Sequence, residues 1–341
     1  MITAIMLIGV CSMAIRFMDG FDKYHSTNNT DISVALARNY TSVVASDSNK
    51  IQAGRFGGHA LQINNYKNWG SISKAISASG VSRFIIGFNL KFMSGGINDR
   101  ALSLGPSNAS VYGGGTSRGL TVRRDGVLAY NTGVLNMTYG TLTNNTWYHI
   151  EMIWPITTSV GNPVKLYVDG AEVASDTTSA GNIAWNGTLL ITSNLAYSTN
   201  ASCIDDLYVL DDTGSTNNTR ISSLSYIPRI ETMYPTSTVA NDFTITGGGT
   251  AHQTLDNVPV NTGQYISSTT TSHKARFEVG DLTNINNIKG VQFGAVCSNT
   301  TTANDDWKFL MNNTEVGTTK TVTDLLSNST QFTEQIFETN I

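Results

Sequence analysis

Carboxylates and a histidine on strand-like stretches are the side chains here whose spacing could support acid–base chemistry. Within one such stretch, His149 and Glu151 share a face, because strand side chains repeat every two residues. A retaining glycoside hydrolase needs two carboxyl groups about 5–5.5 Å apart, yet the same-face neighbours of Glu151 are only His149 and Ile153. Asp205 and Asp206 are adjacent, so a regular strand would point them to opposite faces. Neither arrangement supplies a matched acid and nucleophile.

Other catalytic or metal-binding patterns are also missing from the sequence. No G-x-S-x-G element precedes a helix, as a serine hydrolase of the α/β type would require. The five histidines, which lack H-x-x-x-H spacing, are His25, His59, His149, His252 and His273. The cysteines Cys11, Cys203 and Cys297 are scattered without a C-x-x-C pair, which favours three small buried residues over disulfides or zinc. We therefore expect a non-enzymatic protein that requires no cofactor.

Carbohydrate binding would use an exposed aromatic ring beside amides and carboxylates. Five aromatic residues lie in or beside Gly/Asn-rich segments where loops are expected: Tyr66, Trp69, Tyr112, Tyr130 and Trp185. Three consecutive glycines follow Tyr112 and would let a loop approach a ligand closely. Large aromatic residues near turns also close the ends of sandwich cores. Both interpretations remain open for these five residues.

Short strands joined by tight turns must position all of these residues. Asp125-Gly126 and Asp169-Gly170 are strong hairpin signals between alternating stretches. The predicted strands of this first part cover 83–92, 119–124, 127–130, 146–154, 164–168, 171–174, 183–192 and 204–210. The one stretch with a helix-like pattern is 323–336, and polar residues interrupt it. Regularly spaced strands of this kind predict an all-β sandwich or jelly roll.

A polar, turn-prone stretch over 211–219 separates this part from a second run of strand-like segments. Those segments cover 226–234, 242–246, 274–279, 288–298 and 306–311. We predict an apolar N-terminal segment over 1–16, a β-sandwich over 17–218 and a second, smaller β-sandwich over 219–341.

The first fifteen residues are almost wholly apolar. No Lys or Arg precedes this run, as a signal peptide requires, and it is shorter than the roughly 20 residues that span a bilayer. We expect a strand or helix packed on a neighbour, with a processed signal peptide as the alternative. If the segment is exposed in the isolated subunit, it predicts a partner.

The charge balance limits the classes of partner. Charged residues make up 13% of the 341 residues, against about 25% in typical proteins, and the net charge is −4. Such a chain lacks the basic field that binds nucleic acid. A surface rich in Ser, Thr and Asn suits assembly instead, because burying amides and hydroxyls costs less than burying ions.

The order of segments over 17–210 resembles the laminin-G-like, concanavalin-A-like lectin superfamily. The matching pieces are FMDGFDKY (17–24), RFIIGFNLKF (83–92), GLTVRRDGVLAY (119–130), NNTWYHIEMIW (144–154), VKLYVDGAEVAS (164–175) and CIDDLYVLDDTG (203–214). The strand TWYHIEM followed by the hairpin VKLYVDG is the specific part. With RIETMYP and YISSTTTSHKARFEVGDL added, the chain looks like virion proteins of tailed bacteriophages, in which a laminin-G-like domain precedes a second β domain.

The resemblance makes calcium the metal to consider, because relatives often use Asp and Asn oxygens. Calcium takes six to eight oxygen ligands. One acidic cluster offers enough oxygens, namely Asp205, Asp206, Asp211, Asp212 and Asn217. A solvated loop with Asx turns is the alternative interpretation of the same residues.

The resemblance implies a structural and interaction protein of a phage virion, in the tail, a fibre or the capsid surface. Its expected partners are other virion proteins and further copies of itself, with a trimer as the expected assembly. Neither nucleic acid nor a membrane is an expected partner. The alternative function is an adhesin module that binds a host-surface glycan, and a glycoside hydrolase is a third, less favoured interpretation.

Overall fold

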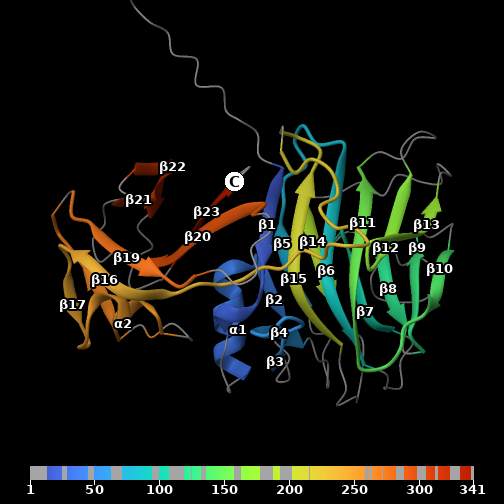
Figure 1. Cartoon of the computed structure of the whole chain (residues 1–341), viewed down its shortest axis with the longest axis horizontal. Coiled ribbons are helices and arrows are strands. Elements are labelled where there is room, and N and C mark those ends of the chain that lie inside the picture. The colour runs from blue at the N-terminus through green and yellow to red at the C-terminus, as the bar shows by residue number, and fades with distance from the viewer. Residues whose placement is uncertain are drawn as a thin grey trace, which may run out of the picture.

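The computed structural model describes residues 14–24, 29–44, 50–62, 71–93, 100–106, 119–123, 125–131, 136–156, 163–176, 187–192, 202–214, 216–257, 261, 263–270, 272–281, 288–297, 305–311, 314–322 and 331–338. Two large antiparallel sheets face each other in the first part of the chain, and smaller β elements follow at one side (Figure 1). The chain is an all-β protein built on a β-sandwich, as the sequence predicts.

The first large sheet has eight strands in the order β13-β12-β11-β6-β15-β4-β3, and β1 pairs with β15 beside this path. The bounds are β1 Ile15–Asp19, β3 Lys50–Ala53, β4 His59–Gln62, β6 Arg83–Phe92, β11 Thr146–Pro155, β12 Val164–Val168, β13 Ala171–Asp176 and β15 Cys203–Asp211. The central pair, β6 and β11, stays in register over ten residues. This long ladder fixes the positions of Asn89 on β6 and of His149 and Glu151 on β11.

The second large sheet has seven strands in the order β10-β9-β8-β7-β14-β5-β2. The bounds are β2 Ser42–Val44, β5 Ser71–Ala75, β7 Arg100–Pro106, β8 Gly119–Arg123, β9 Val127–Asn131, β10 Asn136–Thr141 and β14 Thr188–Thr192.

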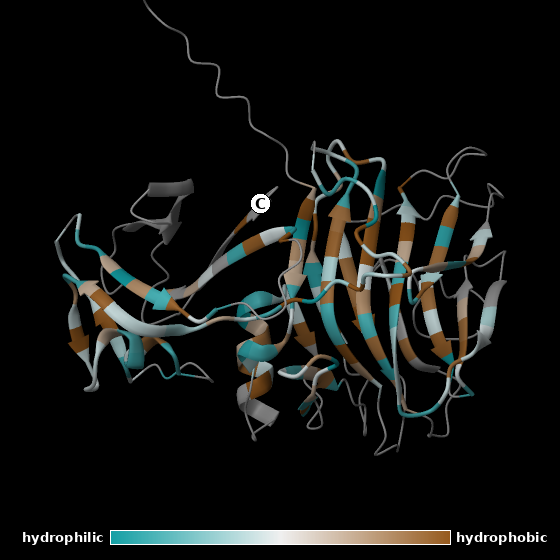
Figure 2. Cartoon of the chain, in the orientation of Figure 1, coloured by the Kyte–Doolittle hydropathy of each residue, from teal (hydrophilic) through white to brown (hydrophobic). Residues whose placement is uncertain are grey.

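The main core fills the space between the two sheets. Hydrophobic bands recur along the sandwich strands (Figure 2) because every second side chain faces inward. On β11, Ile150, Met152 and Trp154 are buried in this core, which confirms the predicted apolar face of that strand. Phe84 and Phe88 of β6 meet it from the neighbouring strand. Burial of such large side chains is the main stabilising contribution to a sandwich.

Both predicted hairpins form, but only the Asp169-Gly170 turn has a positive φ at both residues. Asp169 and Gly170 have φ values of 48° and 83°, as a two-residue turn of this type requires. Gly126, between β8 and β9, also has a positive φ of 83°. A side chain at Gly170 would lie 2.3 Å from the backbone of Ser223, so this turn also packs closely against a later segment.

One helix was not foreseen from the sequence. An α-helix, α1 (Asn29–Asn39), follows a single 3-10 turn, η1 (Asp22–Tyr24), and buries Ile32 and Leu36 in the main core. The stretch 323–336, whose weak helix-like pattern polar residues interrupt, overlaps a strand, β23 (Gln331–Glu338), while 323–330 lies outside the described residues. The backbone of β23 pairs with β20, and this tertiary pairing overrides a weak local pattern. In the part of the chain that is described, no helix has the length and apolar character to cross a membrane.

Beyond residue 234 the described elements form four two-stranded antiparallel sheets, β16-β19, β17-β18, β20-β23 and β21-β22. The bounds are β16 Pro235–Asn241, β17 Thr244–Thr246, α2 Ala251–Leu255, β18 Tyr265–Ser267, β19 Ala275–Val279, β20 Gly290–Cys297, β21 Asp305–Met311 and β22 Thr314–Val322. Most predicted strands of this part are confirmed. The strand predicted over 226–234 is wrong, because this segment lies outside the ladders as an extended connection. A second sandwich and the boundary at 218/219 remain predictions.

The second part contacts the sandwich through a separate apolar cluster. Ile336 of β23 is buried with Ile15, Ile85 and Leu210, which lie on the outer face of the eight-stranded sheet. Cys203 and Cys297 are buried, as expected. Residues 1–13, and with them Cys11 and most of the apolar N-terminal segment, lie outside the described residues.

Candidate functional site

The outer face of the eight-stranded sheet carries polar side chains that are nevertheless buried. His149 and Glu151 of β11, Asn89 of β6 and Tyr208 of β15 are all almost completely shielded from solvent. A segment over 220–232, which we call the strap, crosses this face on its way from β15 to β16 (Figure 1). Buried polar groups must find hydrogen-bond partners, and the strap supplies several of them.

Glu151 is satisfied at both oxygens. The Arg220 guanidinium donates to Oε2 at 2.5 Å, and the Ser222 hydroxyl donates to the same oxygen. The Tyr208 hydroxyl donates to Oε1 at 2.7 Å. Arg220 also donates to the Gly170 carbonyl at 3.2 Å, and its guanidinium carbon lies 3.4 Å from the centre of the Tyr167 ring. The strap therefore closes over the side chain that sequence reasoning singled out as a candidate acid.

His149 shares the face of Glu151, as the alternation predicts. Its Nδ1 lies 3.0 Å from the Asn89 Oδ1, and its Nε2 lies 3.2 Å from the Tyr208 hydroxyl. Burial, followed by the positive charges of Arg55 and Arg220, lowers the pKa of His149 to about 3. The imidazole is therefore neutral at physiological pH, and its two ring nitrogens contact Asn89 and Tyr208.

Gly87 of β6 makes room for this arrangement. A Cβ at this position would lie 2.1 Å from the ring of Tyr208, which stands across the ladder. Only glycine lets the tyrosine ring lie flat on β6, with its hydroxyl placed between His149 and Glu151. A buried Tyr hydroxyl needs such partners.

Asp205 and Asp206 line the same pocket, so the prediction that they point to opposite faces was wrong. The register of β15 against β6 shifts between Asp205 and Tyr208, which marks a β-bulge. Asp206 adopts a φ of 50°, in the left-handed region that Asp and Asn tolerate better than most residues. The bulge inserts an extra residue and cancels the simple alternation of side chains.

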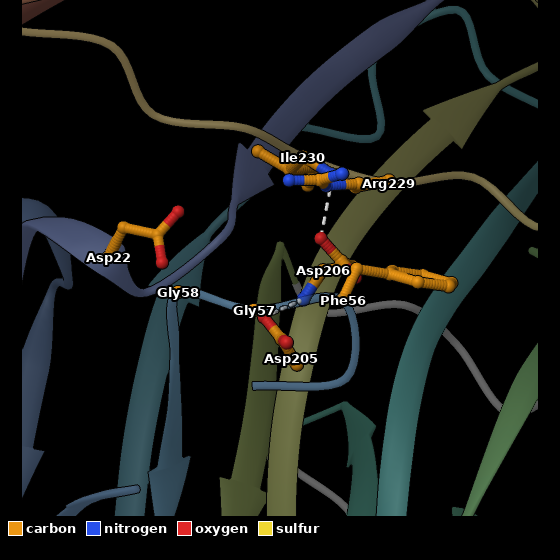
Figure 3. A pocket seen from close by; sticks show the side chains of 8 residues that line it. All are labelled: Asp22, Phe56, Gly57, Gly58, Asp205, Asp206, Arg229 and Ile230. Atoms are coloured by element: carbon orange, nitrogen blue, oxygen red, sulfur yellow. Dashed lines mark hydrogen bonds between the residues drawn. The ribbon is translucent and has the colours of Figure 1, made fainter. Parts of the chain in front are cut away.

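The pocket at the bulge is small, with a volume of about 20 Å³. Figure 3 shows its lining, which comprises Asp22, Phe56, Gly57, Gly58, Asp205, Asp206, Arg229 and Ile230. The backbone N–H of Ile230 donates to Asp206 Oδ1 at 2.6 Å, and the Asn89 amide donates to its Oδ2 at 2.6 Å. The N–H of Arg55 donates to Asp205 Oδ2 at 2.9 Å. A space of this size holds about one water molecule.

The two carboxyls at the bulge resist ionisation. Burial raises the pKa of Asp205, and the neighbouring Asp206 carboxyl raises it further. Burial likewise raises the pKa of Asp206, while the hydrogen bonds from Ile230 and Asn89 oppose that shift. Burial also raises the pKa of Asp22, on the other side of the pocket. The pair therefore holds on to protons more strongly than exposed aspartates do.

The motif over 17–24 has a structural role that its sequence did not reveal. Asp19 is buried and accepts hydrogen bonds from the Tyr24 hydroxyl at 2.6 Å and the Asn39 amide at 3.0 Å. Asp22 accepts from the N–H of His59 at 2.7 Å and from the N–H of Thr232 in the strap at 3.4 Å. One short motif thus ties the first strand, α1 and the strap together.

The five residues predicted to bind calcium are not brought together. Asp205 and Asp206 share the pocket, but Asp211 pairs with the Arg16 guanidinium and Asp212 accepts from the Ser82 hydroxyl. The Asn217 amide donates to the Lys289 carbonyl at 2.7 Å. Among the residues that the structure describes, no group of three or more His, Cys, Asp or Glu side chains is placed to hold a metal ion. The hydrogen-bonded loop is the interpretation that this geometry favours.

The predicted aromatic platform falls mostly on residues outside the described ranges, namely Tyr66, Trp69, Tyr112 and Trp185. Tyr130 lies on β9, where its backbone pairs with Leu120 and Met137. Sequence reasoning missed Phe56, which is 40% exposed at the pocket, with the Arg55 guanidinium 5.3 Å from its ring centre. The Gly-Gly pair directly after Phe56 is a signal for a loop that could have pointed to it.

Removing the arginine of the strap should destabilise the protein strongly. Arg220→Ala leaves the Glu151 carboxylate buried without its charged partner, which typically costs about 3–5 kcal/mol. Urea unfolding of the purified chain measures this cost. Arg123→Ala is the matched control, because its ion pair with Asp125 is about half exposed and should contribute less than about 1 kcal/mol. Equal effects of the two substitutions would contradict the role assigned to the strap.

Unfolding should depend on pH through Asp205 and Asp206. Because the folded state raises their pKa, it keeps a proton that the unfolded chain releases above about pH 4. The free energy of unfolding should therefore fall as the pH rises from about 5 to about 8, by at most about 1.4 kcal/mol per pH unit for one excess proton. Urea unfolding across this range measures the slope. Asp206→Asn should flatten it, whereas Asp125→Asn, on an exposed turn, should leave it unchanged; a slope of opposite sign contradicts the assignment.

Comparison with known proteins shows no match to any protein-family model and no match among curated proteins. Solved structures with similar folds include a carbohydrate esterase of the Shiga toxin-encoding bacteriophage phi24B (16% identity, TM-score 0.36, covering 49% of this chain and 88% of that one). Domain 4 of an extracellular arabinanase from Geobacillus stearothermophilus has 11% identity and a TM-score of 0.39, over 60% of this chain and 96% of that one. The binding domain of botulinum neurotoxin serotype G has 15% identity and a TM-score of 0.33, over 48% of this chain and 43% of that one.

Proposed function

We propose that the chain is a non-enzymatic structural and interaction protein of a bacteriophage virion, in the tail, a fibre or the capsid surface, which assembles with itself and with other virion proteins. The sequence resemblance over 17–24, 203–214 and 265–282 supports the virion setting. The weakly charged, Ser/Thr/Asn-rich composition supports a role in assembly. The observation that carries the proposal is the strap, which fastens the second part of the chain to the sandwich.

The strap also supports a role without catalysis. A general acid must reach its substrate, but Glu151 is fully buried and already accepts three hydrogen bonds. His149, its same-face neighbour, is buried beside it. Opening this face would expose an ion pair and break the connection to the second part. The contacts therefore favour a fixed support over an active centre.

Mass spectrometry of gradient-purified particles tests the proposal. We expect peptides of this chain in a constant ratio to known shell or tail proteins. Particles made with the Arg220→Ala variant should contain several-fold less of the chain, because the buried Glu151 loses its charged partner and the folded chain is less stable, while Arg123→Ala should leave the amount unchanged. A chain that is abundant in the lysate but absent from washed particles would overturn the virion assignment.

Glycan binding is the second candidate, and the exposed ring of Phe56 favours it. An aromatic ring beside a guanidinium and carboxyl groups has the composition of a sugar-contacting surface. Phe56 lines a pocket with Asp205 and Asp206, and the Arg55 guanidinium lies 5.3 Å from the centre of its ring. On an array of bacterial surface polysaccharides, we expect binding that Phe56→Ala reduces at least about tenfold. Phe243→Ala, a change of the same kind in the second part, is the control. Trp69→Ala and Trp185→Ala test the platform predicted from the sequence. Absence of binding to every polysaccharide would reject this function.

A further inference from the structure

We propose that residues 235–281 form a self-association surface through which two copies of this chain pair edge to edge along β19. This inference deepens the proposed function, on which it rests for the expectation of self-assembly. It starts from the weakness of this region as an independent unit. Among its described residues, only Ala251 and Thr254 are buried, so the two ribbons β16-β19 and β17-β18 and the short helix α2 enclose almost no apolar core.

Apolar side chains of this region lie on its surface instead. Of the seven large hydrophobic residues that are exposed in the described part of the chain, four belong to 235–281 and are 39% to 51% exposed: Val239, Leu255, Tyr265 and Val279. In this region, exposed large apolar residues outnumber buried ones, and one of the exposed residues, Val279, lies on β19.

Physical chemistry leaves few ways to stabilise such a region. An isolated two-stranded ribbon is marginal in water, and units of about 40 residues usually need disulfides, metals or oligomerisation. The sequence has no cysteine between 235 and 281. The described residues there include no cluster of metal-binding side chains. Association with a second copy of the chain would add stability to this region.

Strand β19 offers an edge for this association. Within the described residues, β19 pairs with β16 alone, so its other edge faces no described strand. The open edge of a strand presents N–H and C=O groups that can pair with a strand of another chain.

The side chains of β19 fit a second copy of the same strand. In an antiparallel pair centred on Phe277, Phe277 faces its own counterpart, and Ala275 of one copy faces Val279 of the other. On the opposite face of the ribbon, Arg276 of one copy faces Glu278 of the other, and both residues are exposed in the single chain. Aromatic, apolar and opposite-charge cross-strand pairs each stabilise a sheet. Every position thus meets a compatible residue under one twofold axis, the commonest symmetry of homo-oligomers.

Charge exchange tests this pairing without relying on the loss of folding. Sedimentation equilibrium of the full chain should show a monomer–dimer equilibrium for the wild type. Arg276→Glu or Glu278→Arg alone places like charges opposite each other, and each should weaken dimerisation about tenfold. The double variant, with both changes, should restore the wild-type dissociation constant. An equimolar mixture of the two single variants should form heterodimers, because both cross-strand pairs are then opposite in charge.

Arg123→Glu, on an exposed hairpin of the sandwich, is the control and should leave dimerisation unchanged. A wild-type chain that stays monomeric up to about 1 mM would overturn the inference, and so would single variants that dimerise as the wild type does. A monomer that is still found in purified particles would refute this surface but leave the virion function intact. A chain that dimerises as expected but is absent from particles would support this surface and refute the virion function.

Discussion

Carboxylates buried beneath the strap are the constraint on which the rest of this structure depends. Glu151 and Asp206 cannot lie buried, nor Asp22 partly buried, without hydrogen-bond donors, because an unpaired polar or charged group in a shielded position is costly. The strap supplies these donors through the Arg220 guanidinium and through the backbone N–H groups of Ile230 and Thr232. The sheet face and the connecting segment therefore require each other.

This dependence explains why β6 and β15 are buried on both faces. One face of each strand meets the core between the two sheets, as in any sandwich. The other face lies under the strap and, farther along, under the apolar cluster that includes Ile336. An antiparallel sheet commonly leaves one face to solvent, whereas here the chain itself covers part of that face. The covered face is unusual in being polar where Glu151 lies and apolar where Leu210 lies.

Alternation and turn chemistry made the sandwich predictable from the sequence. The strand around Glu151 has a clear period of two, and the Asp169-Gly170 turn has a strong local preference, so both are local properties. The helix α1 was missed because its apolar residues are few and its stability comes from packing Ile32 and Leu36 into the core. The sequence pattern of 226–234 resembles that of a strand, but in the structure this segment pairs with no described strand.

The candidate site was less predictable because its contacts join residues far apart in the chain. Arg220 lies 69 residues from Glu151, and nothing in the local pattern of either residue indicates the other. The β-bulge at Asp206 reverses the face of every later residue in β15, and a simple alternation rule cannot foresee an inserted residue. His149 and Glu151 were correctly placed on one face, yet only the three-dimensional structure shows what covers that face.

The order of attachments along the strap has a mechanical consequence. Tension applied to the chain beyond residue 234 reaches the bond between Thr232 and Asp22 first, then the bond between Ile230 and Asp206, and only afterwards the guanidinium at Glu151. These hydrogen bonds therefore break sequentially. The force does not act directly on the long ladder between β6 and β11. The donors to the carboxyl groups under the strap are thus lost in order, and Glu151 keeps its guanidinium partner longest.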